Sequence, residues 1–250
     1  MEQKSRIPDP ESRQTEGRLK GKIVAVTGAN RGIGLAIARA LNAEGASLVL
    51  MGRNRRGLEK AARELGDARV VVADVTRPRD VERASGEIRR HTPRLDALVN
   101  NAGVFTSKPF TRTTLKDWQT NLAANLTSIF LVTRTVLPLL KRGRDAHLIN
   151  ILSVSSRVAF ANCSAYTAAK FGALGLTRVL RKELRPLGIR VSAILPGSVN
   201  TRMADEFDFP VDRDKLLQPE DVAGAVLAVL VQPRRTTMEE IYLMPSSGAV

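Results

Sequence analysis

Tyr166 and Lys170 lie four positions apart, and on a helix this spacing places both side chains on one face. A phenol has an ordinary pKa near ~10, so it exchanges protons at neutral pH only when its anion is stabilised. A neighbouring ammonium group supplies that stabilisation. The pair is therefore a candidate for general acid–base catalysis, although the same spacing also occurs on ordinary solvated helices.

The elements that must position this pair form a repeating pattern, in which short apolar runs alternate with longer helical segments. The predicted strands are Lys22–Thr27, Ser47–Met51, Arg69–Ala73, Ala97–Asn100, His147–Leu152, Arg190–Leu195 and Ile241–Met244. The predicted helices include Ile33–Ala43, which stops at Gly45, then Leu115–Lys141, Ala165–Leu184 and one opened by Pro219, Glu220 and Asp221. The alternation indicates βαβ units and a parallel sheet. Because the strands are apolar almost throughout, we predict a doubly wound α/β fold with helices on both faces.

Length and composition suit one domain. The chain has 250 residues, of which 43% are hydrophobic, and a core of that size needs no disulfides or metal ions to be stable. We assign the domain to residues 18–250 and expect residues 1–17 to be a flexible tail. The only cysteine is Cys163, and His91 and His147 lie far in sequence from clustered acids or thiols, so neither a disulfide nor a metal site is expected.

The formal net charge of +14 could serve nucleic acid, an acidic partner or a solvated surface. The arginines are dispersed along the chain, and aromatic residues make up only 4% of it, which leaves little for bases to stack on. We therefore favour a solvated surface over nucleic-acid binding. No signal segment and no uninterrupted apolar run of about 18 residues is found, so no membrane association is expected and the predicted location is the cytoplasm.

A glycine-rich turn follows the first predicted strand and opens a helix. The amides at such a helix start can face a pyrophosphate, and the glycines let the backbone approach it closely. The candidate cofactor-binding residues of this turn are Gly28, Asn30, Arg31, Gly32, Ile33 and Gly34. Together with Tyr166 and Lys170 downstream, the turn resembles that of the classical short-chain dehydrogenase/reductase family. The resemblance implies a Rossmann-type sheet of seven parallel strands, and its motifs cover residues 22–245.

Further segments match the family in order and spacing. The resemblance implies cofactor contacts for Asn101, Ala102 and Gly103 after the fourth strand, for Asp74 and Val75 after the third, and for Pro196, Gly197, Val199 and Thr201 after the sixth. Asp74 has a second interpretation, because an aspartate that caps the following turn would look the same.

The resemblance also implies a catalytic set of Asn125, Ser153, Tyr166 and Lys170. Ser153 closes the fifth strand, and Asn125 lies on the long helix, where the family asparagine distorts the helix and anchors a water that reaches the lysine. Asn121, Ser155 and Ser156 are alternatives that lack the family spacing. The implied reaction is hydride transfer to a carbonyl carbon: Tyr166 gives a proton to the oxygen, which Ser153 hydrogen-bonds. Lys170 would bind the nicotinamide ribose, and its charge, together with that of the oxidised nicotinamide ring, would lower the tyrosine pKa.

The end of the second strand indicates which nicotinamide cofactor binds. A carboxylate there would bind the ribose hydroxyls of NAD and repel a 2′-phosphate, but the run is Gly52-Arg53-Asn54. Arg53 and Arg31 offer cations that can hold a phosphate, with Asn54 beside them. We therefore predict that NADP(H) is preferred over NAD(H), against the alternative that both arginines belong to an arginine-rich surface.

The substrate is the least determined feature. We expect residues 198–218, which include Phe207 and Phe209, to form a mobile lid over a small or medium carbonyl or alcohol substrate. A general carbonyl reductase ranks first, and a 3-oxoacyl carrier-protein reductase second, with the basic Lys141–Arg144 loop as a contact for an acidic carrier. The chain lacks the Asp-Gly-Gly-like tail common among such acyl reductases. From the family and the small residues of Ala165–Gly175 we expect a homotetramer, with a dimer next.

Overall fold

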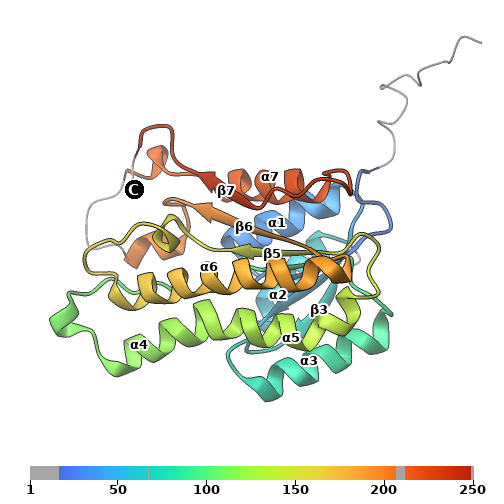
Figure 1. Ribbon diagram of the computed structural model, residues 1–250, viewed down its shortest axis with the longest axis horizontal. Helices are drawn as coiled ribbons and strands as arrows, with labels where there is room; N and C mark the ends of the chain where they lie inside the picture. The colour runs from blue at the N-terminus through green and yellow to red at the C-terminus, as the bar shows by residue number, and fades with distance from the viewer. Residues whose placement is uncertain (1–16, 67, 207–211, 249–250) are drawn as a thin grey trace, which may run out of the picture.

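The structure is a computed structural model that describes residues 17–66, 68–206 and 212–248. Its centre is one seven-stranded sheet with all neighbours parallel, in the order β3-β2-β1-β4-β5-β6-β7 (Figure 1). The strands are β1 (Ile23–Thr27), β2 (Ser47–Gly52), β3 (Arg69–Val72), β4 (Ala97–Asn100), β5 (His147–Ile151), β6 (Arg190–Pro196) and β7 (Glu240–Leu243). All seven predicted strands are confirmed, with ends shifted by no more than one residue.

Seven α-helices of the described chain surround the sheet. They are α1 (Gly32–Ala43), α2 (Arg55–Glu64), α3 (Pro78–His91), α4 (Leu115–Leu122), α5 (Ser128–Leu140), α6 (Ser164–Leu184) and α7 (Pro219–Leu230). Alternate strand residues point to opposite faces, so Val24 and Val26 pack with α1, α2 and α7, whereas Ala25 packs with α3 and α5. Helix α6 covers β6 on that second face. The doubly wound fold is confirmed.

Local sequence explains where two of these helices begin and end. Helix α1 stops before Gly45, whose φ of 83° lies in the left-handed region that glycine adopts readily. Helix α7 begins at Pro219, and the Asp221 side chain accepts a hydrogen bond from the Gln218 backbone N–H at 2.7 Å. The stop at Gly45 and the start at Pro219 with acids in the first turn were predicted and are confirmed.

The predicted long helix over 115–141 is not one regular α-helix. Helix α4 passes into a π-helical turn, η3 (Ala123–Thr127), and then into α5, which ends at Leu140. A π turn holds one extra residue and shifts the following helix, and such turns recur at functional sites. Asn125 lies within it, so the predicted distortion around this residue is confirmed.

By length and composition, the helical run Leu115–Leu140 could cross a membrane. In the fold, it packs against α3, α6 and β4, and its residues Ile129, Val132 and Val136 are buried in the core. A helix that covers a sheet needs an apolar face, so packing in the core explains the apolar composition of Leu115–Leu140.

Two predicted flexible regions fall partly outside the described residues. Residues 1–16 of the predicted tail lie outside the described residues. Its last residue, Gly17, is described, and its carbonyl accepts a hydrogen bond from the Lys20 N–H in a turn before β1. In the predicted lid over 198–218, the short 3₁₀ helices η6 (Arg202–Glu206) and η7 (Arg213–Lys215) are described. Phe207 and Phe209 lie outside the described residues.

Candidate active site

A cavity of about 1240 Å³ opens at the carboxyl ends of the strands. That volume exceeds the roughly 300–1,000 Å³ of common ligand pockets, so it suits a dinucleotide together with a substrate. Every predicted site residue lines it: Gly28, Asn30, Arg31, Gly32, Ile33, Gly34, Arg53, Asn54, Asp74, Val75, Asn101, Ala102, Gly103, Asn125, Ser153, Tyr166, Lys170, Pro196, Gly197, Val199 and Thr201. The fold thus joins, at one place, segments spread over most of the chain.

The glycine turn is packed tightly against the loop that follows β4. A Cβ atom on Gly34 would lie 2.3 Å from the Gly28 carbonyl oxygen and 2.5 Å from Asn101 Nδ2, so no side chain fits there. Asn101 Nδ2 donates to the Thr27 carbonyl at 2.9 Å. Thr27 Oγ1 in turn accepts from the backbone N–H groups of Asn101 and Ala102, at 2.9 and 3.0 Å. Thr27 is a residue that sequence analysis missed, and it fastens two walls of the cavity together.

At the far end of the cavity, Arg53 is exposed and its Nη1 lies 3.8 Å from Asp74 Oδ2. Arg77, which sequence analysis missed, lies 3.9 Å from the same oxygen. Thr76 donates to Asp74 Oδ1 through its backbone N–H and its hydroxyl, at 3.0 and 2.7 Å. Burial raises the pKa of Asp74, but the Thr76 hydrogen bonds and the two guanidinium groups outweigh it, so the pKa is lowered overall. Asp74 therefore caps a turn and also lines the cavity.

Asn54 has a structural task as well. Its Oδ1 accepts from the Gly57 backbone N–H at 3.1 Å and caps the start of α2.

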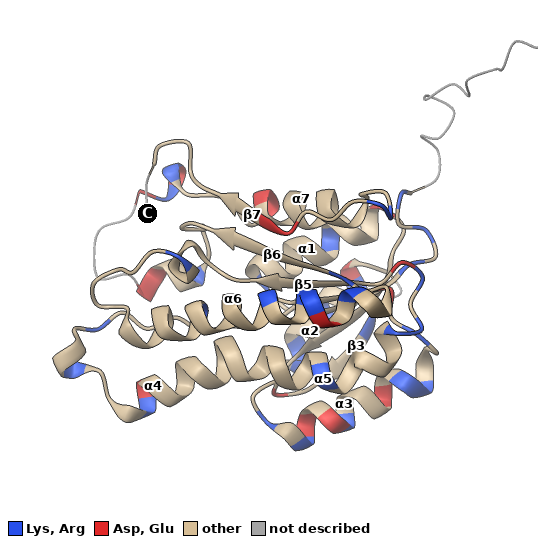
Figure 2. Ribbon diagram, in the orientation of Figure 1, with Lys and Arg blue, Asp and Glu red and all other residues tan. Residues whose placement is uncertain are grey.

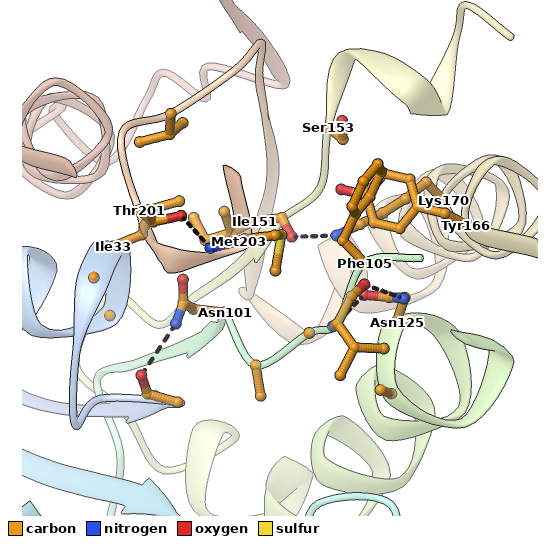
Figure 3. Close-up of a pocket in the computed structure, with 18 of the residues that line it drawn as sticks. Ile33, Asn101, Phe105, Asn125, Ile151, Ser153, Tyr166, Lys170, Thr201 and Met203 are labelled. Atoms are coloured by element: carbon orange, nitrogen blue, oxygen red, sulfur yellow. Dashed lines mark hydrogen bonds between the residues drawn. The ribbon is translucent and has the colours of Figure 1, made fainter. Parts of the chain in front are cut away.

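The candidate catalytic side chains converge from β5 and α6 (Figure 3). Tyr166 and Lys170 are buried on one face of α6, and Ser153 follows the end of β5. Lys170 Nζ donates to the Ile151 carbonyl at 3.3 Å and lies 5.5 Å from the centroid of the Tyr166 ring. The predicted shared face of tyrosine and lysine is confirmed.

In the protein alone, burial decides the direction of the shift in the tyrosine pKa. Burial raises the pKa of Tyr166 to about 12, and the hydrogen bond with Ser153 only partly opposes it. Burial lowers the pKa of Lys170 to about 8. The expected lowering of the tyrosine pKa depends on the charge of the oxidised nicotinamide as well as on Lys170, so it stays a prediction. Tyr166 is protonated at neutral pH, as a phenol of ordinary pKa also is, and the protonated form is the one that donates a proton.

Phe105, which sequence analysis missed, packs against the catalytic tyrosine. The two rings meet edge to face, with centroids 4.9 Å apart and planes at 81°, a favourable aromatic geometry. Phe105 lies in the loop between β4 and η2 (Phe110–Arg112), and Figure 3 shows it beside Tyr166 and Lys170. It thus contributes to the desolvation of the tyrosine. Among the other cavity residues that were not predicted are Gln119, Phe160, Cys163 and Met203.

Asn125 holds the loop after β4 through its side chain. Its Nδ2 donates to the Val104 carbonyl at 2.9 Å and its Oδ1 accepts from the Val104 N–H at 3.2 Å. Asn121, the predicted alternative, is buried and hydrogen-bonds Asn125 at 3.3 Å and Thr106 at 3.0 Å. Asn121 therefore supports Asn125. The water relay through the Asn125 carbonyl stays a prediction.

A buried hydrogen-bond network fastens the elements beneath the site. Asn100 Nδ2 donates to Asn150 Oδ1 at 2.9 Å and to Thr133 at 3.1 Å, and Asn150 Nδ2 donates to Thr177 at 2.9 Å. These bonds link β4, β5, α5 and α6, so the elements that carry Ser153 and Tyr166 are fixed relative to each other.

Comparison with known proteins agrees with this geometry. Residues 22–209 match the family model described as short chain dehydrogenase. An uncharacterized oxidoreductase of Staphylococcus epidermidis is 35% identical over 229 residues, which cover 91% of this chain and 99% of that protein.

Solved structures are similar over nearly the whole chain. An alcohol dehydrogenase of the archaeon Thermococcus sibiricus, complexed with 5-hydroxy-NADP, superposes with a TM-score of 0.84 at 28% identity, covering 90% of this chain and 97% of that one. A metagenomic short-chain oxidoreductase in complex with NADP superposes with a TM-score of 0.80 at 30% identity, covering 92% and 99%. With the Ser153, Tyr166 and Lys170 constellation in place, the chain belongs to the short-chain dehydrogenase family of oxidoreductases.

Proposed function

We propose that the protein is an NADP(H)-dependent oxidoreductase that interconverts a carbonyl and a secondary alcohol on a small or medium substrate. The observation that carries the proposal is the convergence of Ser153, Tyr166 and Lys170 at one wall of a cavity whose other wall is the glycine turn. The turn fits a dinucleotide because Gly34 leaves no room for a side chain and the helix start offers free amides.

The cofactor, when bound, supplies the hydride. The glycine turn and the Asn101–Gly103 loop would hold its phosphates and sugars, and Pro196–Thr201 its nicotinamide. Tyr166 holds the proton that the carbonyl oxygen receives, and Lys170, with the charge of the oxidised nicotinamide, would stabilise the anion that remains. Ser153 hydrogen-bonds Tyr166 and is positioned to bind the same oxygen. Phe105 packs on the tyrosine and helps to exclude water.

The preference for NADP(H) is supported from two sides. Gly52 leaves no carboxylate at the end of β2, and Arg53 and Arg31 line the cavity. Structural neighbours were solved with NADP or NADPH. Arginine forms charge-assisted, often bidentate hydrogen bonds to phosphate, which suits a 2′-phosphate.

A carbonyl panel tests the proposal. The purified protein is given NADPH with aldehydes, ketones and oxoacyl thioesters, and NADPH consumption and the product alcohol are measured. We expect turnover of at least one ketone or aldehyde. If nothing is reduced while NADPH binds tightly, the protein is a cofactor-binding protein of another class.

The second candidate, a 3-oxoacyl carrier-protein reductase, gains no support from the Lys141–Arg144 loop. This loop precedes β5, and its Arg144 N–H donates to Asp96 at the start of β4. It therefore lies at the amino ends of the strands, and the cavity lies at their carboxyl ends. An acidic carrier docked on this loop would be separated from Tyr166 by at least the length of a strand, about 17 Å for five residues.

We also propose a cytoplasmic homotetramer, with a dimer as the next alternative. The small residues that suggested close packing between subunits are partly used within the chain, since Ala169 and Ala173 are fully buried. Better support comes from Phe130, Phe171 and Val179, apolar side chains of α5 and α6 that are 44%, 44% and 49% exposed. Sedimentation at micromolar concentration tests the assembly, and a monomer would contradict it.

A further inference from the structure

The loop that follows β4 is fastened to the helical run α4–η3 at every second residue. Three hydrogen-bonded pairs join the loop to helix positions that are four residues apart: Val104 with Asn125, Thr106 with Asn121, and Lys108 with Asp117. Such helix positions share one face. Four helix residues rise about 6 Å and two residues of extended chain span about 6.6 Å, so the loop runs along this face in step with its turns.

This register turns the intervening loop residues toward the cavity. Phe105 and Ser107 line the cavity, whereas Thr106 and Lys108 do not. The Phe105 ring meets the Tyr166 ring edge to face, with centroids 4.9 Å apart, and Figure 3 shows the two rings beside each other. Because the residues on both sides of Phe105 are bonded to the helix, its ring is held against the tyrosine.

A backbone hydrogen bond joins this loop to the segment that follows β5. The Lys108 N–H donates to the Asn162 carbonyl at 2.7 Å. The β5 segment brings Phe160 and Cys163 to the cavity, and Cys163 is buried at the start of α6. With Phe105, these two side chains form an apolar wall on the side of the cavity that carries the catalytic tyrosine.

The charged residues of the cavity lie elsewhere or are already bonded. Those that line it are Arg31, Arg53, Asp74, Lys170 and Arg202. The first three follow β1, β2 and β3, which lie beyond β4 from β5 in the sheet. Lys170 donates to a backbone carbonyl, and Arg202 is exposed. A charged group placed on the apolar wall would therefore lose its hydration without gaining a partner among the described residues.

We propose that the site takes an uncharged ketone or aldehyde with an aromatic group beside the carbonyl, and that Phe105 selects this group. This inference rests on the proposed function and names its substrate class. The aromatic ring of the substrate packs on the apolar wall, because aromatic rings attract each other in edge-to-face and offset arrangements. The carbonyl oxygen lies at Tyr166 and Ser153. The carbonyl carbon receives the hydride of the cofactor and the oxygen the tyrosine proton, which gives an aryl alcohol.

Four ketones of graded chemistry test the proposal: acetophenone, its charged analogue 4-acetylbenzoate, cyclohexyl methyl ketone and acetone. We measure kcat/KM for each with NADPH. We expect acetophenone to exceed 4-acetylbenzoate at least ten-fold, because the carboxylate finds no partner on the apolar wall. Acetophenone should also exceed cyclohexyl methyl ketone a few-fold, because only the aryl ring forms an aromatic pair.

Variants of Phe105 assign the selection to this residue. Phe105→Ala should lower kcat/KM for acetophenone about ten-fold more than for acetone, and Phe105→Leu should remove the preference for the aryl over the cyclohexyl ketone. The ratio between ketones is the readout, since a change that only disturbs Tyr166 lowers all rates alike. Phe110→Ala is the matched control, because Phe110 lies on the same loop, is 80% exposed and does not line the cavity.

The proposal is overturned if 4-acetylbenzoate is reduced as well as acetophenone, or if Phe105→Ala lowers the rates of all ketones by one factor. Binding without turnover separates this result from a failure of the proposed function. The complex with NADP⁺ cannot reduce acetophenone, and ligand-observed NMR measures its affinity for acetophenone and for 4-acetylbenzoate. A preference for acetophenone that Phe105→Ala removes supports the inference even in a protein that reduces nothing. An active enzyme without this preference keeps the function and loses the inference.

Discussion

Buried polar side chains have different partners at the two ends of the sheet. At the carboxyl ends, Tyr166 and Lys170 are buried at the cavity with no carboxylate partner among the described residues. At the amino ends, the buried Asp96 accepts from Arg94 Nε at 3.1 Å and from the Ile23 N–H at 2.8 Å. Burial that shifts the pKa of an unpaired group is a feature of functional sites, whereas a paired buried charge contributes to the folded structure.

The amino end carries a dense set of such pairs. Asp145 lies 2.8 Å from Arg190, 3.9 Å from Lys22 and 3.8 Å from Arg234. Figure 2 shows many Lys and Arg segments in the loops at the right-hand end, where the strands begin. Cations at the carboxyl ends of helices also interact favourably with the helix dipole. We therefore expect changes at the carboxyl end to alter activity and changes at the amino end to alter stability.

The largest expected effect is at the carboxyl end. Tyr166→Phe should lower reduction by ~10²- to 10⁴-fold, because a positioned acid is removed, while cofactor affinity and thermal stability stay close to those of the wild type. Steady-state kinetics, cofactor titration and thermal melting measure the three quantities. Activity within a few-fold of the wild type would remove Tyr166 from the mechanism.

The next effect is at the amino end. Asp96→Ala leaves Arg94 Nε and the backbone N–H groups of Ile23 and Arg144 without their acceptor, so we expect a loss of about 3 kcal/mol in the free energy of unfolding. Denaturant titration measures it, and activity per folded molecule should be unchanged. Asp205→Ala is the control, because its ion pair with Arg213 is exposed and such pairs contribute about 1 kcal/mol or less. Equal losses of unfolding free energy in the two variants would contradict the stabilising role assigned to the buried Asp96.

Arg53 tests recognition at the exposed end of the cavity. Arg53→Ala should weaken NADPH binding about ten-fold and leave NADH binding nearly unchanged, since one charge-assisted hydrogen bond contributes on the order of 1.5 to 3 kcal/mol. Because the side chain is exposed, added salt should reduce the preference for NADPH. Titration of both cofactors at two salt concentrations is the measurement. Equal weakening of both would return Arg53 to the solvated surface.

His147 is an exception at the amino end, because it is buried with a shifted pKa and has no acidic partner among the described residues, yet it lies away from the cavity. Burial, with the charges of Arg190 and Lys22, lowers its pKa to about 3, and its Nε2 hydrogen-bonds Ser192 at 2.8 Å. Between the ordinary pKa of about 6.5 and 3, the unfolded chain binds a proton that the folded chain does not. Stability should therefore fall with decreasing pH, by up to ~1.4 kcal/mol per pH unit.

Denaturant titrations between pH 7 and pH 5 measure this slope, with His147→Gln as the comparison. The variant should show a shallower dependence because the titrating group is gone. Identical slopes would mean that other groups carry the acid sensitivity.

Local patterns were enough to predict the architecture. Apolar runs such as Val24–Val26 and the stop at Gly45 act through neighbours in the chain, so the strands and the end of α1 could be predicted residue by residue. The motif residues could be assigned to one cavity for a related reason. In a doubly wound sheet, every segment that follows a strand ends at the same edge.

Contacts between those segments were decided only by the tertiary structure. Nothing in the local sequence shows that Phe105 packs on Tyr166, that Asn125 holds Val104, or that Thr201 meets Gly32 and brings Arg202 to the cavity. The tyrosine pKa shows the same limit. Its spacing from Lys170 shows which cation lies near the ring, but burial depends on everything packed around the ring, and in the protein alone desolvation raises the pKa.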